Sequence, residues 1–348
     1  MIIKMAIADG NNEYIERLLS VLEGYEDLNL SVYTDRSALE QALASKHFDV
    51  FLFDPSVYDG QVEVGKNTLA IMFLDDNVNV PESCRDFKKV KKYQRISRIY
   101  QQVLGLYAEV CGDIGGVIGG GSVSAIAVYS PVGGSGKTTL ALALATRLAD
   151  MGRRVFYMSL EDIASEDCYL VQSDAKGLSD VAASLGENIN FTMKIQALLQ
   201  NRGENLYYLN HFESPNDVYE MNGDEVTELV EQLEKTGLFD TVVIDTGTSM
   251  NDKMFHLFEV VDKIVLIEKE DSISVRKMNC FLSQNHIINE YSHKMCRVIN
   301  FHIGRDSMLQ TNIPLVGKIN MAQNPDPAQF IAMLANNPSL SFAGQLIG

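Results

Sequence analysis

Short apolar runs alternate with amphipathic segments along the first hundred residues. The apolar runs, typical of strands, lie at residues 2–8, 30–33, 50–53 and 69–74, with a weaker one at 87–90. Apolar positions spaced every three to four residues predict helices at 13–22, 37–44 and 96–108. The run Val50–Phe53 contains no polar residue, so we expect that strand to be buried on both faces. This alternation predicts a parallel, doubly wound α/β domain over residues 1–110.

A glycine-rich segment, residues 111–122, interrupts this pattern. Its glycines make a helix or a strand costly, so we expect a linker there. The pattern then restarts, and we assign residues 123–348 to a second α/β domain with a mostly parallel sheet. Its predicted strands lie at residues 123–129, 155–158, 206–209, 241–244, 263–267 and 297–299. Helices are predicted up to Leu148 after the first strand and over residues 224–235.

Composition places the chain among ordinary proteins that are neither exported nor membrane-spanning. It has 348 residues, 46% of them hydrophobic, and no apolar stretch near the roughly 18 residues that span a bilayer. The five cysteines show no CxxC spacing, which favours reduced thiols in the cytoplasm. A net charge of −17 disfavours strong nucleic-acid binding. One basic run, residues 88–98, is interpreted as a solvated face.

Candidate chemistry is concentrated between Pro131 and Thr139, after the first strand of the second domain. Gly133, Gly134 and Gly136 would let backbone N–H groups surround phosphates at a helix N-terminus. In this interpretation Lys137 supplies charge to the β- and γ-phosphates, and Thr138 coordinates Mg²⁺. The full set predicted to hold ATP in this loop is Gly133, Gly134, Ser135, Gly136, Lys137, Thr138 and Thr139. A glycine-rich turn without a ligand is the alternative, but it gives Lys137 and Thr138 no role.

Two carboxylates follow later strands. Asp245 ends the apolar run Thr241–Ile244, where it would hold Mg²⁺ through water. Glu161 follows the strand after the loop helix and could orient or deprotonate an attacking water. An exposed acidic loop is nearly as good an interpretation of Glu161.

These motifs resemble the deviant Walker A ATPases, the class of MinD, ParA and the nitrogenase iron protein. The resemblance covers about residues 123–320 and includes the Asp-Thr-Gly at 245–247 and the segment Ile313–Ile319. It implies that Asn300, at the end of Val298-Ile299-Asn300, reads adenine. It also implies a P-loop NTPase fold and a homodimer.

The first domain resembles a response-regulator receiver, of flavodoxin-like fold, with Asp54 where receivers carry the phosphoacceptor. Asp9 follows the first strand, and Lys92 lies near the usual lysine of the fifth. A degenerate receiver joined to such an ATPase resembles the TadZ/CpaE family. That resemblance implies positioning of type IV (Tad) pilus machinery at a cell pole, with pilus or secretion proteins as partners.

The sequence departs from the patterns of both the ATPase class and the receiver, and these departures change the expected function. Val132 stands where the ATPase class carries its signature lysine, and a comparable cationic finger contributes about 10³–10⁵ in rate. Pro131 replaces the first glycine, and Glu161 replaces an Asp. In the receiver, Asp9-Gly10-Asn11 lacks the second of two adjacent acids, so we expect Asp54 to be structural and the domain to bind proteins.

The leading hypothesis is therefore an ATP-binding dimeric scaffold with slow or no hydrolysis. An actively hydrolysing MinD/ParA-type ATPase is the alternative, and it needs a replacement cation such as Arg276 or Arg305. A tyrosine kinase with a similar loop ranks lower, because the last tyrosine is Tyr291. Residues 321–348 contain no Lys or Arg, which favours a core or dimer-packing helix over a membrane anchor.

Overall fold

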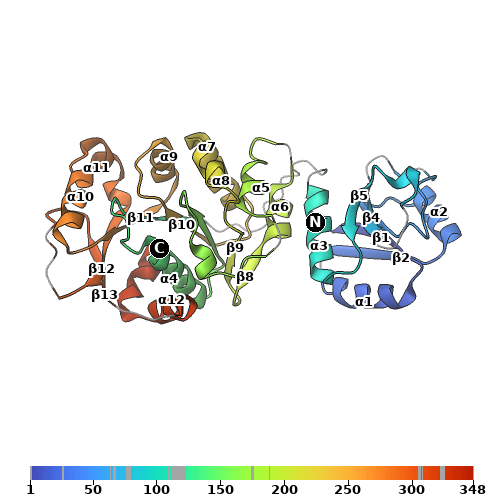
Figure 1. Ribbon diagram of the computed structural model, residues 1–348, viewed down its shortest axis with the longest axis horizontal. Coiled ribbons are helices and arrows are strands. Elements are labelled where there is room, and N and C mark those ends of the chain that lie inside the picture. The colour runs from blue at the N-terminus through green and yellow to red at the C-terminus, as the bar shows by residue number, and fades with distance from the viewer. Residues whose placement is uncertain are drawn as a thin grey trace. The chain divides into compact units, whose positions relative to one another are not determined.

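Two parallel sheets organise the chain in the computed structural model (Figure 1). The structure describes residues 2–25, 27–62, 64–65, 68–75, 80–108, 110, 123–173, 176–187, 189–304, 307, 309–321 and 326–347. The predicted linker 111–122 and Arg305 lie outside these residues. One unit comprises residues 1–114 and 188–197, and the other comprises 115–187 and 198–348. Each unit is described by itself.

The first unit contains a five-stranded, all-parallel sheet in the order β2-β1-β3-β4-β5. Its strands are β1 (Ile3–Ala8), β2 (Leu28–Tyr33), β3 (Val50–Phe53), β4 (Leu69–Leu74) and β5 (Lys88–Lys91). All four residues of β3 are buried, as their apolar run predicts. The receiver-like α/β fold expected from the sequence is thus confirmed.

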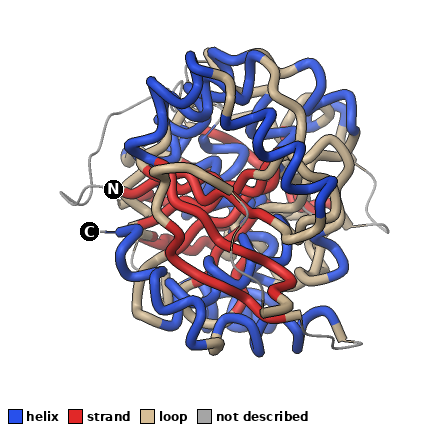
Figure 2. Tube along the Cα trace, turned by 90° about the vertical axis from the view of Figure 1, so that its left-hand side faces the viewer, coloured by secondary structure: helices blue, strands red, loops and turns tan. Residues whose placement is uncertain are grey.

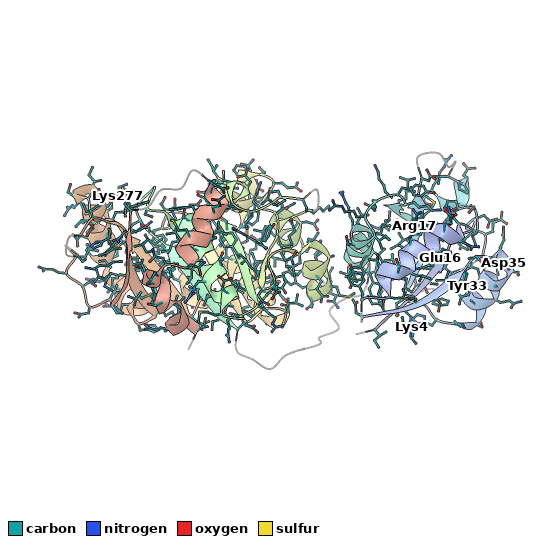
Figure 3. All side chains as sticks on the ribbon, turned by 90° about the horizontal axis from the view of Figure 1, so that it is seen from below. Lys4, Glu16, Arg17, Tyr33, Asp35 and Lys277 are labelled. Atoms are coloured by element: carbon teal, nitrogen blue, oxygen red, sulfur yellow. The ribbon has the colours of Figure 1, made fainter. Side chains whose placement is uncertain are left out.

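Helices cover both faces of this sheet, but unequally. On one face, α1 (Asn12–Leu22) and α3 (Ile96–Ala108) pack on alternate residues of β1 and β4. Glu16 and Arg17 lie on the outward side of α1 (Figure 3). On the other face, α2 (Arg36–Ser45) packs through Leu39 and Ala42. Within the described residues, the connections from β3 to β4 and from β4 to β5 contain only one short 3₁₀ helix, Glu82–Cys84.

A helix from much later in the chain completes the first unit. Met193 and Ala197 of α6 (Phe191–Leu198) belong to the same apolar cluster as α1 and α3. The Asn190 N–H donates to the Ala108 carbonyl oxygen at 3.2 Å, at the end of α3. The sequence pattern contains no signal for this placement of α6 in the first unit, because an apolar helix face does not specify which sheet it covers.

The second unit contains an eight-stranded sheet in the order β13-β12-β11-β6-β10-β7-β9-β8, which is parallel except for the edge strand β8. The strands are β6 (Ser124–Tyr129), β7 (Val155–Leu160), β8 (Gln200–Arg202), β9 (Leu206–Tyr208), β10 (Thr241–Thr246), β11 (Lys263–Glu268), β12 (Met295–His302) and β13 (Leu315–Asn320). The polar strand β8 was not predicted, because three polar residues give no apolar period.

Helices lie on both sides of these strands (Figure 2). They are α4 (Lys137–Asp150), α5 (Leu178–Ala182), α7 (Pro215–Glu220), α8 (Gly223–Lys235), α9 (Asp252–Val260), α10 (Ser272–Leu282), α11 (Asn285–Tyr291) and α12 (Pro327–Ala335). The buried residues Ile331 and Leu334 place α12 against α4 in the main core. No helix among the described residues is long and apolar enough to cross a membrane.

Candidate functional site

The loop between β6 and α4 lies at the centre of the second sheet, at the carboxyl ends of the strands. Such edges are the usual ligand sites of open α/β sheets. Gly134 and Gly136 have φ angles of 65° and 84°, which side chains rarely adopt. A Cβ atom on Gly136 would lie 2.4 Å from Asn300 Nδ2, so glycine is required there for space as well. At Gly133 and Gly134 the same atom would meet nothing within 4 Å.

A buried serine holds the start of the loop. The Ser130 hydroxyl donates to the Ile267 carbonyl oxygen at 2.7 Å and accepts from the Val132 N–H at 3.2 Å. Val132 is only 5% exposed. The position that carries a lysine in the resembling ATPases is therefore filled by a packed apolar side chain. Sequence reasoning missed Ser130, although its place between an apolar strand and the glycines was a usable signal.

Lys137, Thr138 and Glu161 lie together at the first turn of α4. The Thr138 hydroxyl donates to Glu161 Oε2 at 3.1 Å, and Lys137 Nζ is 3.4 Å from Glu161 Oε1. The Lys137 side chain is 6% exposed. Both groups that were predicted to meet phosphate and Mg²⁺ thus contact a carboxylate of this chain. Thr139 lies beside them, with its hydroxyl 3.4 Å from that of Tyr169.

Asp245 is fully buried near the end of β10. Its Oδ2 accepts from the Tyr157 hydroxyl at 3.4 Å. Burial raises the pKa of Asp245 well above its usual value, and the nearby charge of Glu161 raises it further. The same burial raises the pKa of Tyr157. A cation at this point would compensate the carboxylate charge that burial disfavours.

Two buried atoms test whether a Mg²⁺–nucleotide would fit here. Asp245 Oδ1 and Ser135 Oγ have no hydrogen-bond partner in the described part of the chain. Oxygen donors are what Mg²⁺ prefers, and a buried unpaired polar atom is costly until a ligand satisfies it. Thr138 and Asp245 would hold the cation, and it would neutralise phosphate charge. The residues present therefore fit the group that the sequence predicts.

Asn300 lies at the loop, but its amide is engaged with the protein. Its Nδ2 donates to the Ser135 carbonyl oxygen at 2.8 Å, and its Oδ1 accepts from the Phe301 N–H at 3.0 Å. Phe301, with a φ of 56°, is the only non-glycine residue with positive φ among those described. A small cavity nearby is lined by Thr139, Leu140, Asn300, Phe301, Ile319, Asn320, Phe330 and Leu334. Adenine reading by Asn300 stays a prediction.

Glu161 also lines a pocket of about 250 Å³, whose thirteen lining residues include five acids: Glu161, Asp162, Glu166, Asp167 and Glu213. Of these, Glu166 is 3% exposed, and sequence reasoning did not single it out. Burial raises the pKa of Glu166, since its charged form loses hydration. Arg276, a proposed replacement cation, is exposed on α10.

The first unit carries its own cluster of carboxylates and lysine, at the carboxyl ends of β1, β3 and β5. Lys92 Nζ lies 2.7 Å from Asp9 Oδ2 and 2.5 Å from Asp54 Oδ2, and all three side chains are at most 7% exposed. The Ser56 hydroxyl donates to Asp54 Oδ1 at 2.6 Å. Burial alone would lower the pKa of Lys92, but its bonds to Asp54 and Asp9 more than offset burial and raise it. The same contacts lower the pKa of Asp54 against the opposing effect of burial.

Family models match both units. Residues 126–340, more than half of the chain, match the CobQ/CobB/MinD/ParA nucleotide-binding domain. Residues 1–108 match the TadZ-like receiver domain. No curated protein matches the chain.

Solved structures share the fold of the second unit. The ParA family ATPase of Chlorobium tepidum aligns with a TM-score of 0.52 at 14% identity, over 65% of this chain and 96% of that one. MinD in the MinC:MinD complex of Aquifex aeolicus aligns with a TM-score of 0.51 at 17% identity, with the same coverage. At such low identity the likeness shows the fold alone.

Proposed function

Because the chain belongs to the CobQ/CobB/MinD/ParA nucleotide-binding family, with a TadZ-like receiver ahead of that domain as in the TadZ/CpaE architecture, we propose that it is an ATP-dependent positioning scaffold. In this proposal ATP and Mg²⁺ bind at Gly133–Thr139 and Asp245 and favour a homodimer. The dimer recruits Tad pilus or secretion proteins to a cell pole, and hydrolysis is slow or absent. The partners and the polar site follow from the family resemblance.

One observation carries the scaffold proposal: the loop keeps Gly133–Thr138, but the position of the signature lysine is a buried valine, Val132. The loop retains Gly133, Gly134 and Gly136 with Lys137 and Thr138. Asp245 Oδ1 and Ser135 Oγ are buried and have no hydrogen-bond partner among the described residues. Val132 offers no charge to a second nucleotide, because it is uncharged and packed inside its own subunit. A loop of this kind supports binding better than rapid phosphoryl transfer.

Sedimentation of the full chain with and without ATP–Mg²⁺ tests nucleotide control directly. We expect a monomer without nucleotide, a dimer with it, and no dimer for Lys137→Ala. Lys277→Ala, on the exposed surface of α10 (Figure 3), is the matched control. Identical sedimentation of wild type and Lys137→Ala under both conditions would remove nucleotide control from the proposal.

A turning-over ATPase is the second candidate, and the contacts of Glu161 favour it. This carboxylate lies within 3.4 Å of both Lys137 and Thr138, close enough to act on a water at the phosphates. Steady-state phosphate release distinguishes the two functions. Turnover near 1 s⁻¹ that is abolished by Asp245→Ala would favour the enzyme, whereas the scaffold predicts rates lower by about 10³.

Polar placement is tested with a fluorescent fusion in a bacterium that assembles Tad pili. The proposal expects polar foci for the wild-type chain and diffuse fluorescence for Lys137→Ala. Diffuse fluorescence of both would refute the positioning role, even where ATP binding is intact.

A further inference from the structure

The last strand of the receiver sheet, β5, is an edge strand among the described residues. In the described sheet it pairs only with β4, in a parallel register that runs from Ile71–Lys88 to Leu74–Lys91. Backbone groups on an unpaired strand edge are a template for another strand. Lys88, Lys89 and Lys91 are exposed along this edge, while Val90 points into the core.

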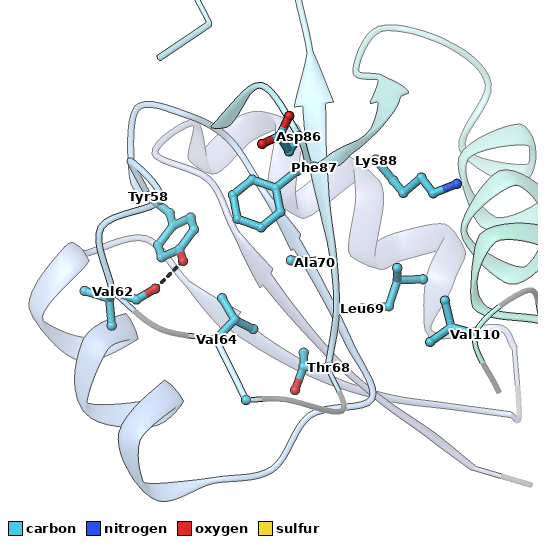
Figure 4. Close-up of a pocket in the computed structure, with 12 residues that line it drawn as sticks. Tyr58, Val62, Val64, Thr68, Leu69, Ala70, Asp86, Phe87, Lys88 and Val110 are labelled. Atoms are coloured by element: carbon cyan, nitrogen blue, oxygen red, sulfur yellow. Dashed lines mark hydrogen bonds between the residues drawn. The ribbon is translucent and has the colours of Figure 1, made fainter. Parts of the chain in front are cut away.

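A pocket lies beside the start of this strand (Figure 4). Its volume is about 480 Å³, and its apolar lining includes Tyr58, Val62, Val64, Leu69, Ala70 and Phe87. The Tyr58 hydroxyl donates to the Val62 carbonyl oxygen across it (Figure 4). Asp86 and Lys88 are its charged residues. The pocket forms at the part of the sheet where the described connections after β3 and β4 contain no α-helix.

This pocket is separate from the cluster of Asp9, Asp54 and Lys92. Leu69 and Lys88 are the first residues of β4 and β5, whereas Asp54 and Lys92 follow the last residues of β3 and β5. The two features thus lie at opposite ends of the parallel strands. The buried cluster contributes none of the residues that line the pocket.

Positive charge is concentrated on β5 and in the residues that flank it in the sequence, although Arg85 pairs with Glu82 at 3.5 Å. Residues 85–98 contain one acid, Asp86, and six exposed basic side chains: Arg85, Lys88, Lys89, Lys91, Arg95 and Arg98. This local surplus occurs in a chain whose net charge is −17. Lysines on a strand edge disfavour apolar or basic strands, because like charges would lie opposite one another. They stabilise a strand that carries acids, and they speed its encounter.

We propose that the β5 edge and its pocket form a docking site for an acidic, extended segment of a partner protein. The segment adds to the sheet as a sixth strand beyond β5, its acids face Lys89 and Lys91, and one apolar side chain enters the pocket. Main-chain hydrogen bonds then supply affinity, and the lysines with the pocket supply selectivity. The site uses no residue of the nucleotide loop, so the docking proposal can be tested separately from the proposed function.

The test measures fluorescence anisotropy, against the full chain, of a labelled peptide that carries two Glu and one Val on the same side of an extended strand, with Ser at the positions between them. Three control peptides share its length: one replaces Glu with Gln, one is N-methylated at alternate backbone nitrogens, and one replaces Val with Ser. We expect saturable binding of the acidic peptide that weakens with salt, and at least about tenfold weaker binding of each control. Equal binding of the N-methylated peptide would overturn strand addition. Equal binding of the Gln peptide would overturn charge selection.

Protein variants locate the site. Lys89→Glu with Lys91→Glu should weaken the acidic peptide by about tenfold or more, since two favourable cross-strand pairs become repulsive. Lys235→Glu with Lys277→Glu makes the same charge change on exposed residues of α8 and α10 and should leave binding unchanged. Val64→Asn should weaken binding without changing charge. Circular dichroism confirms folding, and equal affinities of the β5 and control doubles would overturn the proposal.

The experiment must also distinguish a different partner protein from a second copy of this chain as the occupant of the site. The acidic surplus of residues 111–348 gives another copy the required charge. Sedimentation of wild type and Lys89→Glu/Lys91→Glu without nucleotide should be identical if the partner is a different protein. Self-association that the double variant abolishes would overturn the assignment to a separate partner.

Discussion

Both sheets carry a lysine among carboxylates at the carboxyl ends of their strands, but the lysine pairs with two carboxylates in one cluster and with one, at a longer distance, in the other. In the first unit, Lys92 bridges Asp9 and Asp54 at 2.7 and 2.5 Å. In the second, Lys137 makes one longer contact of 3.4 Å, to Glu161. Asp245 Oδ1 has no partner among the described residues there.

The difference teaches how burial and pairing separate a structural cluster from a binding site. A buried charge is tolerated when an opposite charge lies within hydrogen-bond distance, and Lys92 gives this to both carboxylates. Asp245 instead shares its surroundings with Glu161, which raises its pKa. A cation can lower the free energy of the second cluster, whereas in the first it would have to displace Lys92.

The largest expected effect comes from removing the lysine of the first cluster. Lys92→Met leaves Asp9 and Asp54 buried without a cation and should destabilise the first unit by about 3–5 kcal/mol. Urea unfolding followed by circular dichroism measures this loss. Lys91→Met removes an exposed lysine from the preceding position and should change stability by less than about 0.5 kcal/mol. Similar losses of unfolding free energy for both variants would mean that Lys92 does not stabilise the buried carboxylates of Asp9 and Asp54.

Removing the lysine of the second cluster should affect ligand binding more than folding. Lys137→Ala loses a charge-assisted contact with phosphate, so ATP–Mg²⁺ affinity should fall about 10- to 100-fold. Isothermal titration calorimetry measures it, with Lys277→Ala as the control. Affinity within twofold of wild type would show that the loop does not hold the phosphates through Lys137.

Substitutions in a protein core usually lower stability, but Asp245→Asn should raise it above about pH 4. Because the native pKa of Asp245 is raised, its ionisation costs stability as pH rises through that native value. Without nucleotide, the variant should therefore match wild type near pH 4 and exceed it by about 1–3 kcal/mol at higher pH. Thermal unfolding against pH measures this, and ATP–Mg²⁺ should stabilise wild type more than the variant. A variant less stable than wild type at every pH would contradict the argument.

Glu161→Gln gives the smallest expected change. Glu161 contacts the two groups that would meet phosphate and repels its charge, so neutralising it should tighten ATP binding by about two- to fivefold. Glu213→Gln changes another acid of the adjacent pocket and serves as the control. Weaker binding of Glu161→Gln would indicate that this carboxylate supports the nucleotide instead of competing with it.

Apolar periodicity predicted most of the fold. The helix Ile96–Ala108 and the strands Val50–Phe53 and Leu69–Leu74 have the predicted bounds, because their burial follows from local pattern. The polar strand β8 and the placement of α6 in the first unit had no such signal. Both depend on which surface a segment meets after the chain has folded.

The candidate site divides in the same way. Gly136, Lys137 and Thr138 could be assigned from their order, because a strand–loop–helix motif places them as neighbours. Tyr157 and Glu166 could not, since they lie in separate elements and only the fold brings them to the site. Ser130, directly before the loop in the sequence, could have been assigned but was missed. The amide of Asn300, predicted from resemblance to read adenine, donates to the loop's own backbone at Ser135.

The sequence by itself determined the α/β class, the phosphate loop and the missing signature lysine, because each is encoded within a few adjacent residues. Only the tertiary structure decided which buried charges are paired and which are not. Lys92 closes on Asp54 across 38 residues, whereas the charge of Lys137 does not offset the effects of burial and of Glu161, which raise the pKa of Asp245. Pairing depends on distances and burial across the folded chain, and these physical quantities separate a structural cluster from a site for a ligand.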